Sequence, residues 1–301
     1  MRNFLRKFAF YTELRYLYRV FFIYRKPTQY IYNRFVVGPS IKTKPKLKES
    51  PLDKSFSIHL LSGHQNTLML AWALASWQEV APKSAQVYVH EDGTFTGSDR
   101  VLIRSVSPQA EIVDREIISP EVIGFLDKYP ALKKMRESAS SYIFVLKLVD
   151  PIFVSQASYC LIIDTDVLWF SSPGDLFQNI GNLHPFMLDA GSPMEYKFSD
   201  GSELPEIARC ANSGIVGYQI KDNIFESLEA FCQKNGPNNP SRVIEQAAFA
   251  YVLARDPNFR YLPADKYGLK WHEGMVARHY TGPVREKFWF EGVKKLAKEI
   301  L

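Results

Sequence analysis

The chain of 301 residues is 46% hydrophobic, which is typical of a soluble globular protein, and it has room for one large domain or two small ones. Its net charge of +5 is unevenly distributed, because residues 1–48 carry twelve Lys and Arg against one acid, Glu13, and the remaining chain is mildly acidic. This asymmetry disfavours nucleic-acid binding by the whole body and favours a basic arm that meets an anionic surface.

The cysteines indicate a reducing, cytoplasmic compartment. Cys160, Cys210 and Cys232 are odd in number, far apart and without metal-binding spacing, so they do not suggest a disulfide framework. No signal peptide is evident. The most apolar stretch near the start, residues 20–24, is far shorter than the roughly twenty apolar residues that cross a bilayer.

Residues 1–50 are interpreted as a basic arm and linker ahead of one domain at 51–301. Aromatic and leucine side chains recur every three or four positions in residues 1–26, which predicts one face of a helix, and the arginines lie largely off that face. Such a helix can lie in the headgroup layer of an anionic membrane, giving a peripheral location on its cytoplasmic face. The alternative is a helix that packs on the protein's own body. Residues 38–51 are rich in Pro and Lys and are typical of a linker.

Alternating strand and helix patterns in the body predict an α/β fold with a mainly parallel sheet. Polar clusters at 62–67, at 90–93 and at Asp164 and Asp166 each follow an expected strand, so we expect them to share one edge of the sheet. No Gly-x-Gly-x-x-Gly motif is present, which argues against a Rossmann dinucleotide site. Strands are expected at 56–61, 86–90, 159–163, 167–170, 185–189, 215–219, 260–262 and 276–278. Helices are expected at 68–80, 96–106, 119–138, 140–150 (ended by Pro151), 222–235 (capped by Asp222), 243–254 and 286–300.

The apolar run at 159–163 ends in Asp164-Thr165-Asp166. Burying an unpaired carboxylate is costly, so these two acids either meet water or hold something positive. Side chains at i and i+2 of an extended segment point the same way, so two hard oxygen ligands face one spot. Such ligands suit Mg²⁺ or Mn²⁺. The alternative is a surface turn that carries two acids.

His279 is the candidate for a third metal ligand, because it closes a short expected strand and a neutral imidazole suits Mn²⁺ better than Ca²⁺. Without other evidence, a histidine next to a tyrosine in the sequence more often has a structural role than a metal-binding one. Gly282 permits close approach of the backbone to a ligand, and Arg285 supplies a planar cation that matches phosphate oxygens. A metal, an arginine and a glycine loop together describe a clamp for a diphosphate.

The order of these motifs resembles that of the metal-dependent GT-A glycosyltransferases. The resemblance covers about residues 56–289 and is strongest to the retaining glycogenin- and lipopolysaccharide galactosyltransferase-like group (family 8). That group has a basic residue seventeen positions before its first metal-binding Asp, as Lys147 is before Asp164 (164 − 147). The family pattern is matched, in chain order, by Lys147, Pro151, Asp164-Thr165-Asp166, Asp189, Asn212-Ser213-Gly214, Glu245-Gln246 and the segment from His279 through Gly282 to Arg285.

The resemblance implies a transferase that moves a sugar from a nucleotide-diphosphate donor to a glycan or lipid-linked acceptor, with retention of configuration. It implies that Asp164, Asp166 and His279 hold Mn²⁺ or Mg²⁺. Asp189, Glu245 and Gln246 would then lie at the reacting face of the sugar. The implied donor contacts are Lys147, Asp164, Thr165, Asp166, Asn212, Ser213, Gly214, Gly282 and Arg285.

The sequence departs from the family pattern at two places. The first loop has Gly63-His64-Gln65-Asn66 where the family offers acidic or Asn contacts to a uridine. In the closing motif Arg285 replaces the Lys, and the Pro-Trp that follows that Lys in the family is absent. Two other functions stay open at this point. A nucleotidyltransferase would prefer a Gly-rich, basic first loop, which is missing, and a non-catalytic membrane-associated scaffold would have lost metal ligands, which are intact in the sequence.

Overall fold

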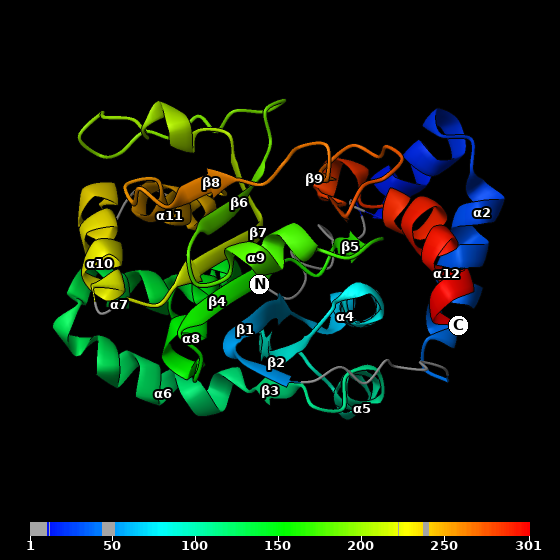
Figure 1. Cartoon of the computed structure of the whole chain (residues 1–301), viewed down its shortest axis with the longest axis horizontal. Helices are drawn as coiled ribbons and strands as arrows, with labels where there is room; N and C mark the ends of the chain where they lie inside the picture. The colour runs from blue at the N-terminus through cyan, green and yellow to red at the C-terminus, as the bar shows by residue number, and fades with distance from the viewer. Residues whose placement is uncertain (1–10, 12, 44–51, 222, 237–240) are drawn as a thin grey trace.

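The computed structural model describes residues 11, 13–43, 52–221, 223–236 and 241–301. The strands form two sheets within these residues (Figure 1). The larger has the order β3 (Glu111–Val113), β2 (Ser84–Glu91), β1 (Leu52–Ser62), β4 (Tyr159–Ile163), β7 (Ala211–Gln219), β6 (His184–Leu188) and β8 (Phe259–Tyr261). The smaller has the order β5 (Val167–Trp169), β10 (Ala277–His279) and β9 (Tyr267–Gly268).

The larger sheet is mixed and mainly parallel. From β3 to β4 the neighbouring strands run parallel, β7 is antiparallel to both β4 and β6, and β6 and β8 are again parallel. Helices alternate with these strands along the chain. This topology confirms the predicted α/β fold.

Helices cover both faces of the sheet (Figure 1). Alternate residues of β4 explain why, because Leu161 and Ile163 join one hydrophobic core while Cys160 and Ile162 join the other. The first core is covered by α4 (Thr67–Val80), α5 (Gly97–Val106), α9 (Gly174–Asn179) and α12 (Lys294–Ile300). The second is covered by α6 (Arg115–Phe125), α7 (Pro130–Glu137), α8 (Leu146–Val154), α10 (Ile224–Asn235) and α11 (Ile244–Leu253).

Two predicted helices have different bounds in the structure. The helix predicted at 119–138 is two helices, α6 and α7, because Tyr129 precedes Pro130 and takes a non-helical conformation (φ −128°, ψ 72°). The prediction that Pro151 ends a helix at 150 is also wrong. Helix α8 continues through Pro151 to Val154, and its buried apolar side chains outweigh the hydrogen bond that proline cannot donate.

Other predicted elements agree to within a few residues, and the sequence reasoning missed the strands β3 and β9 and the helix α9. The predicted cap Asp222 lies outside the described residues, and α10 begins at Ile224. The C-terminal helix predicted at 286–300 is a π-helical segment, η9 (Phe288–Val293), followed by α12.

The described part of the N-terminal segment packs on the body. It comprises a helical stretch at 13–18, η1 (Arg19–Ile23), α2 (Pro27–Tyr32), η2 (Asn33–Val37) and α3 (Gly38–Ser40), beside α12 in Figure 1. Val20, Tyr30 and Ile41 belong to the first hydrophobic core, and the Trp72 indole donates to the carbonyl of Gly38 (3.1 Å). The expected apolar face itself is exposed at Leu14, Tyr18 and Phe21, so this segment packs on the body through other residues.

The other predictions for this segment are tested only in part. Residues 1–10 and 12 of the arm and 44–51 of the linker lie outside the described residues. None of the described helices is both long enough and apolar enough to cross a bilayer.

Candidate active site

The loops after β1, β2 and β4 meet at one edge of the larger sheet, as expected. These strands are parallel neighbours, and Ser62 pairs with Glu91 at their carboxyl ends. The backbone N–H of Asp92 donates to the carbonyl of Ser62 (2.9 Å), which ties the first two loops together. Asp164 follows β4 directly and reaches the same edge.

The Asp-x-Asp carboxylates converge on His279 because the smaller sheet brings the two segments together. Val167 of β5 pairs with His279 of β10, and the Tyr280 N–H donates to the carbonyl of Asp166 (2.8 Å). The imidazole Nε2 of His279 lies 3.0 Å from Asp166 Oδ1 and 3.5 Å from Asp164 Oδ2. Candidate ligand atoms of the three residues all lie within 4.8 Å of one another.

The orientation of His279 is fixed from behind by Asn212. Imidazole Nδ1 lies 2.8 Å from Asn212 Oδ1, which also accepts from the Gly214 N–H (3.0 Å). An amide oxygen only accepts, so Nδ1 carries a proton toward Asn212, and Nε2 is the ring nitrogen that faces the two carboxylates. Gly214 is required here, since an added Cβ would lie 2.2 Å from Nδ1 of His279.

The outer oxygens of the two carboxylates are taken by cations. Lys147 Nζ lies 2.5 Å from Asp164 Oδ1, and Arg285 donates to Asp166 Oδ2 from Nη2 (2.7 Å) and Nε (3.1 Å). Burial alone would raise the pKa of Asp166, but the charges of Arg285 and His279 hold that pKa well below its usual range. Asp166 is therefore ionised and oriented by Arg285.

Lys147 also reaches the predicted catalytic pair. Its Nζ lies 3.2 Å from Glu245 Oε1, while Glu245 Oε2 accepts from the Ser213 hydroxyl (3.1 Å) and Gln246 Oε1 accepts from the Ser213 N–H (3.2 Å). Burial would lower the pKa of Lys147, but the adjacent Asp164 and Glu245 raise it well above its usual value. Burial, together with the charge of Asp164, raises the pKa of Glu245 despite Lys147.

Charge also decides the protonation of His279. Burial would lower the pKa of this imidazole, but Asp166 and, to a lesser degree, Asp164 raise it above its ordinary value. The point between Nε2 and the two carboxylates therefore favours a positive charge. Two carboxylates and an imidazole form a donor set that fits Mn²⁺, or Mg²⁺ with more difficulty because of the nitrogen ligand.

Three predicted residues lie near this cluster but make no side-chain hydrogen bond or ion pair with it. Asp189 follows β6 beside the start of β7, where its N–H donates to the carbonyl of Cys210 (2.8 Å). Thr165 is buried between the two aspartates. Gly282 is exposed, and neither a positive φ nor a neighbouring protein atom requires glycine there.

The structure adds residues that the sequence reasoning missed. Arg19 forms an ion pair with Glu286 (2.6 Å) and donates to the carbonyl of Gly282 (3.3 Å), so the N-terminal segment supports the loop that carries Arg285. No local sequence pattern links residues 267 positions apart. Phe144 lies under Lys147, with Nζ 5.2 Å from its ring centroid, and the three-residue helical spacing could have revealed this contact.

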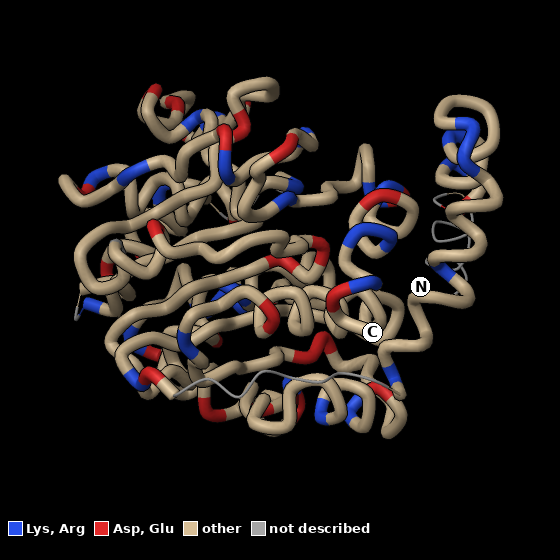
Figure 2. The backbone as a smooth tube through the Cα atoms, turned by 45° about the vertical axis from the view of Figure 1, so that its right-hand side comes forward, with Lys and Arg blue, Asp and Glu red and all other residues tan. Residues whose placement is uncertain are grey.

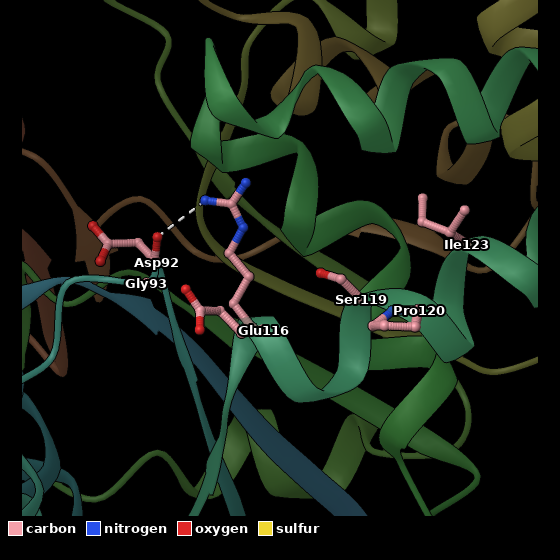
Figure 3. Close-up of a pocket in the computed structure, with 7 residues that line it drawn as sticks. Asp92, Gly93, Glu116, Ser119, Pro120 and Ile123 are labelled. Carbon is pink, nitrogen blue, oxygen red and sulfur yellow. Dashed lines mark hydrogen bonds between the residues drawn. The ribbon is translucent and has the colours of Figure 1, made fainter. Parts of the chain in front are cut away.

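Two cavities adjoin this region. One, of about 570 Å³, lies between the Asp92 turn and the start of α6 (Figure 3). There Arg115 donates to the carbonyl of Asp92 (3.0 Å). The other, of about 650 Å³, lies between α7 and α10 and is lined in part by Tyr142 and Ile244, the latter adjacent in sequence to Glu245. Neither cavity is lined by a residue of the cluster around His279.

Comparisons with known proteins identify the fold. No protein-family model and no curated protein sequence matches the chain. Mouse xyloside xylosyltransferase 1 aligns with a TM-score of 0.50 and 12% identity over 76% of this chain and 98% of its own. An active-site mutant of LgtC aligns with a TM-score of 0.50 and 14% identity over 81% and 96%. Galactosyltransferase LgtC with donor and acceptor sugar analogs aligns with a TM-score of 0.49 and 15% identity, also over 81% and 96%.

The protein therefore has the GT-A fold, as the sequence motifs predicted. At identities of 12% and 14% this likeness establishes the architecture alone. The chemistry has to be argued from the side chains at the sheet edge.

Proposed function

We propose that the protein is a metal-dependent glycosyltransferase that transfers a sugar from a nucleotide-diphosphate donor to a glycan or lipid-linked acceptor, with retention. The observation that carries this proposal is the convergence of Asp164 Oδ2, Asp166 Oδ1 and His279 Nε2 on one point. Lys147 and Arg285 hold the other oxygen of each aspartate, so the converging atoms are oriented toward a shared cation. The GT-A fold supports the same class of reaction.

The charge balance of the cluster supports a divalent cation. Lys147 and Arg285 contribute two positive charges against the three carboxylates of Asp164, Asp166 and Glu245. Without a metal, a proton on His279, whose pKa is raised, brings the sum only to 0 (3 − 3), whereas a metal-bound His279 is neutral. A bound Mn²⁺ or Mg²⁺ changes the sum to +1 and lets the same residues attract a diphosphate.

The metal and the two positive side chains are proposed to act together on the diphosphate of the donor. A metal held by Asp164, Asp166 and His279 would act as a Lewis acid toward the leaving diphosphate. Lys147 and Arg285 add fixed positive charge at the place where negative charge develops. Both are already oriented by carboxylates, so little reorganisation is needed when the donor binds.

The acidic and amide side chains are proposed to orient the sugar. Both oxygens of Glu245 are engaged, by Lys147 and by Ser213, so Glu245 is better suited to a fixed negative charge beside an oxocarbenium-like carbon than to a mobile nucleophile. The oxygen of Asn212 is committed to His279 and Gly214, which leaves its amide N–H₂ for a sugar hydroxyl. Gln246 and Asp189 complete the set at the reacting face.

The acceptor is proposed to reach Glu245 from the side of Tyr142, where the cavity between α7 and α10 provides room. Burial and the charge of Glu245 raise the pKa of Tyr142, so its hydroxyl stays protonated and donates to the Arg242 carbonyl. The proposed location is cytoplasmic, with residues 1–26 of the basic arm at an anionic membrane surface.

Hydrolysis of a panel of nucleotide-diphosphate sugars with Mn²⁺ tests the proposal. We expect Asp164→Asn and His279→Ala to reduce turnover about 100-fold or more, since each removes a metal ligand. The exposed acid Asp265 provides the matched control, Asp265→Asn, which should hydrolyse the donor at the normal rate. Unchanged turnover in both ligand variants would refute the metal mechanism, and NMR of the released sugar or product reports retention or inversion.

A further inference from the structure

The N-terminal segment exposes an unusual amount of apolar surface. Among the described residues sixteen large apolar side chains are exposed, and eleven of them lie between positions 11 and 36. Soluble monomers rarely expose contiguous apolar patches of this kind without a binding role. The patch includes Leu14, Leu17, Tyr18, Phe21, Phe22, Ile23, Ile31, Tyr32, Phe35 and Val36.

These side chains lie on a helical hairpin with one face turned inward and one turned outward. The chain reverses at Arg25, which has a positive φ of 53°, and α2 then starts at Pro27. Arg34 of the second arm reaches back to Glu13 of the first, with two contacts of 2.8 and 2.9 Å. The spacing of the exposed residues, three or four apart on each arm, gives each a continuous outer stripe.

The hairpin is held firmly by its inner face. Val20 and Tyr30 are 0% and 1% exposed, and the Arg19 ion pair with buried Glu286 adds a polar attachment. Phe22 and Phe35, on the outer face, are 68% and 61% exposed. The outer stripes are therefore a fixed feature of the folded surface.

The charge of the hairpin selects the kind of partner. Its exposed polar positions include Arg15, Arg25, Lys26 and Lys42, and Glu13 is the one acid among described residues 11–43. Lys and Arg mark the helical column at the right-hand edge of Figure 2. Two copies of such a face would repel each other, whereas a surface of anionic headgroups over an apolar layer matches both its charges and its aromatic rings.

We infer that residues 13–37 form a docking surface for an anionic phospholipid bilayer, into which Phe22, Phe35 and their neighbours insert while the basic side chains contact headgroups. The hairpin lies in the interface and does not span it, in keeping with the absence of a spanning helix among the described residues. The mildly acidic body is repelled by the same headgroups, so docking also orients the protein. This inference does not rest on the proposed transferase activity.

Flotation of the full-length protein with phosphatidylcholine vesicles, with and without phosphatidylglycerol, tests the inference. We expect binding to anionic vesicles that weakens with salt, and we expect Phe22→Ser/Phe35→Ser to bind on the order of 100-fold more weakly. Ile117, 73% exposed on α6 of the body, provides the matched control, and Ile117→Ser should float like the natural protein.

Three outcomes would overturn the inference. One is a natural protein that stays unbound to anionic vesicles. Another is equal flotation of the natural protein and the double variant. The third is a concentration-dependent dimer in sedimentation, without vesicle binding, that Phe22→Ser/Phe35→Ser dissociates, since the face would then join two copies of the chain. Circular dichroism of both variants verifies that each is folded.

Discussion

Gly214 lies on β7 directly beneath the imidazole of His279, so an alanine there perturbs the candidate metal site through one methyl group. The added Cβ would lie 2.2 Å from Nδ1 and 2.7 Å from Cε1. Non-bonded contacts are normally about 3.5–4.0 Å, so the ring has to move by over about 1 Å. Ligand distances at a metal tolerate about 0.2 Å, and the shift also breaks the hydrogen bond to Asn212.

We expect Gly214→Ala to weaken Mn²⁺ binding at least about 10- to 100-fold, the usual effect of losing an outer partner of a ligating histidine. Mn²⁺ affinity is measured by calorimetry or by the electron paramagnetic resonance signal of free Mn²⁺. Donor hydrolysis at saturating Mn²⁺ should recover in part, because excess metal compensates for weaker affinity but leaves the ring displaced.

Gly217, on the same strand, provides the matched control. A Cβ at this buried position would lie 2.4 Å from the Tyr159 hydroxyl, away from the metal ligands. Both alanine variants should lose about 1–3 kcal/mol of unfolding free energy through overpacking. Gly217→Ala should retain Mn²⁺ affinity, and equal Mn²⁺ affinity in Gly214→Ala and the natural protein would refute the assignment of His279 as a ligand.

Three further predictions follow from buried charges. Lys147→Met should reduce donor turnover about 100-fold, whereas Lys147→Arg should retain most of it, as measured by steady-state hydrolysis. Arg19→Met should cost about 3–5 kcal/mol of unfolding free energy by leaving Glu286 buried without its partner, and Arg19→Met/Glu286→Leu should recover most of this loss in denaturant titrations. Burial lowers the pKa of His59 well below its ordinary value and that of His90 to about 3, so the unfolded chain binds more protons below pH ~6.5. Stability should therefore fall from pH ~6.5 downward, by about 1.4 kcal/mol per pH unit for each histidine, as measured by unfolding at several pH values.

Each of these predictions has an outcome that contradicts it. Normal turnover in Lys147→Met would mean that Lys147 does not act on the donor. A double variant no more stable than Arg19→Met would show that the ion pair is not the cause of the loss. His90→Gln should reduce the slope of stability against pH, and an unchanged slope would mean that His90 does not contribute to acid sensitivity.

Much of the candidate site was predictable because short sequence patterns contain its residues. A buried strand that ends in Asp164-Thr165-Asp166 constrains two carboxylates to one side at a sheet edge. His279 was a candidate ligand from its own sequence context, the resemblance in motif order then pointed to Lys147 and Asn212, and the structure brings these side chains together. Strand and helix periods likewise predicted the α/β fold.

Errors arose where tertiary packing overrides a local signal. Pro151 ends a helix in isolation, but the buried apolar face of α8 keeps the helix going to Val154. The N-terminal aromatic pattern predicted a helical face without showing which rings face the body. In the structure Tyr18 and Phe21 of that face are exposed, while Val20 is buried in the first hydrophobic core.

The sequence by itself determined the residue types, their order and the direction in which neighbouring side chains point, because these depend on backbone geometry over a few residues. Only the tertiary structure decided which oxygen of Asp166 meets Arg285, 119 positions away, and that Arg19 supports the loop carrying this arginine. It also gave Gly214 its role beneath His279, since that contact exists only once β7 and β10 are in place. Such pairings result from the packing of whole elements, and no local period encodes them.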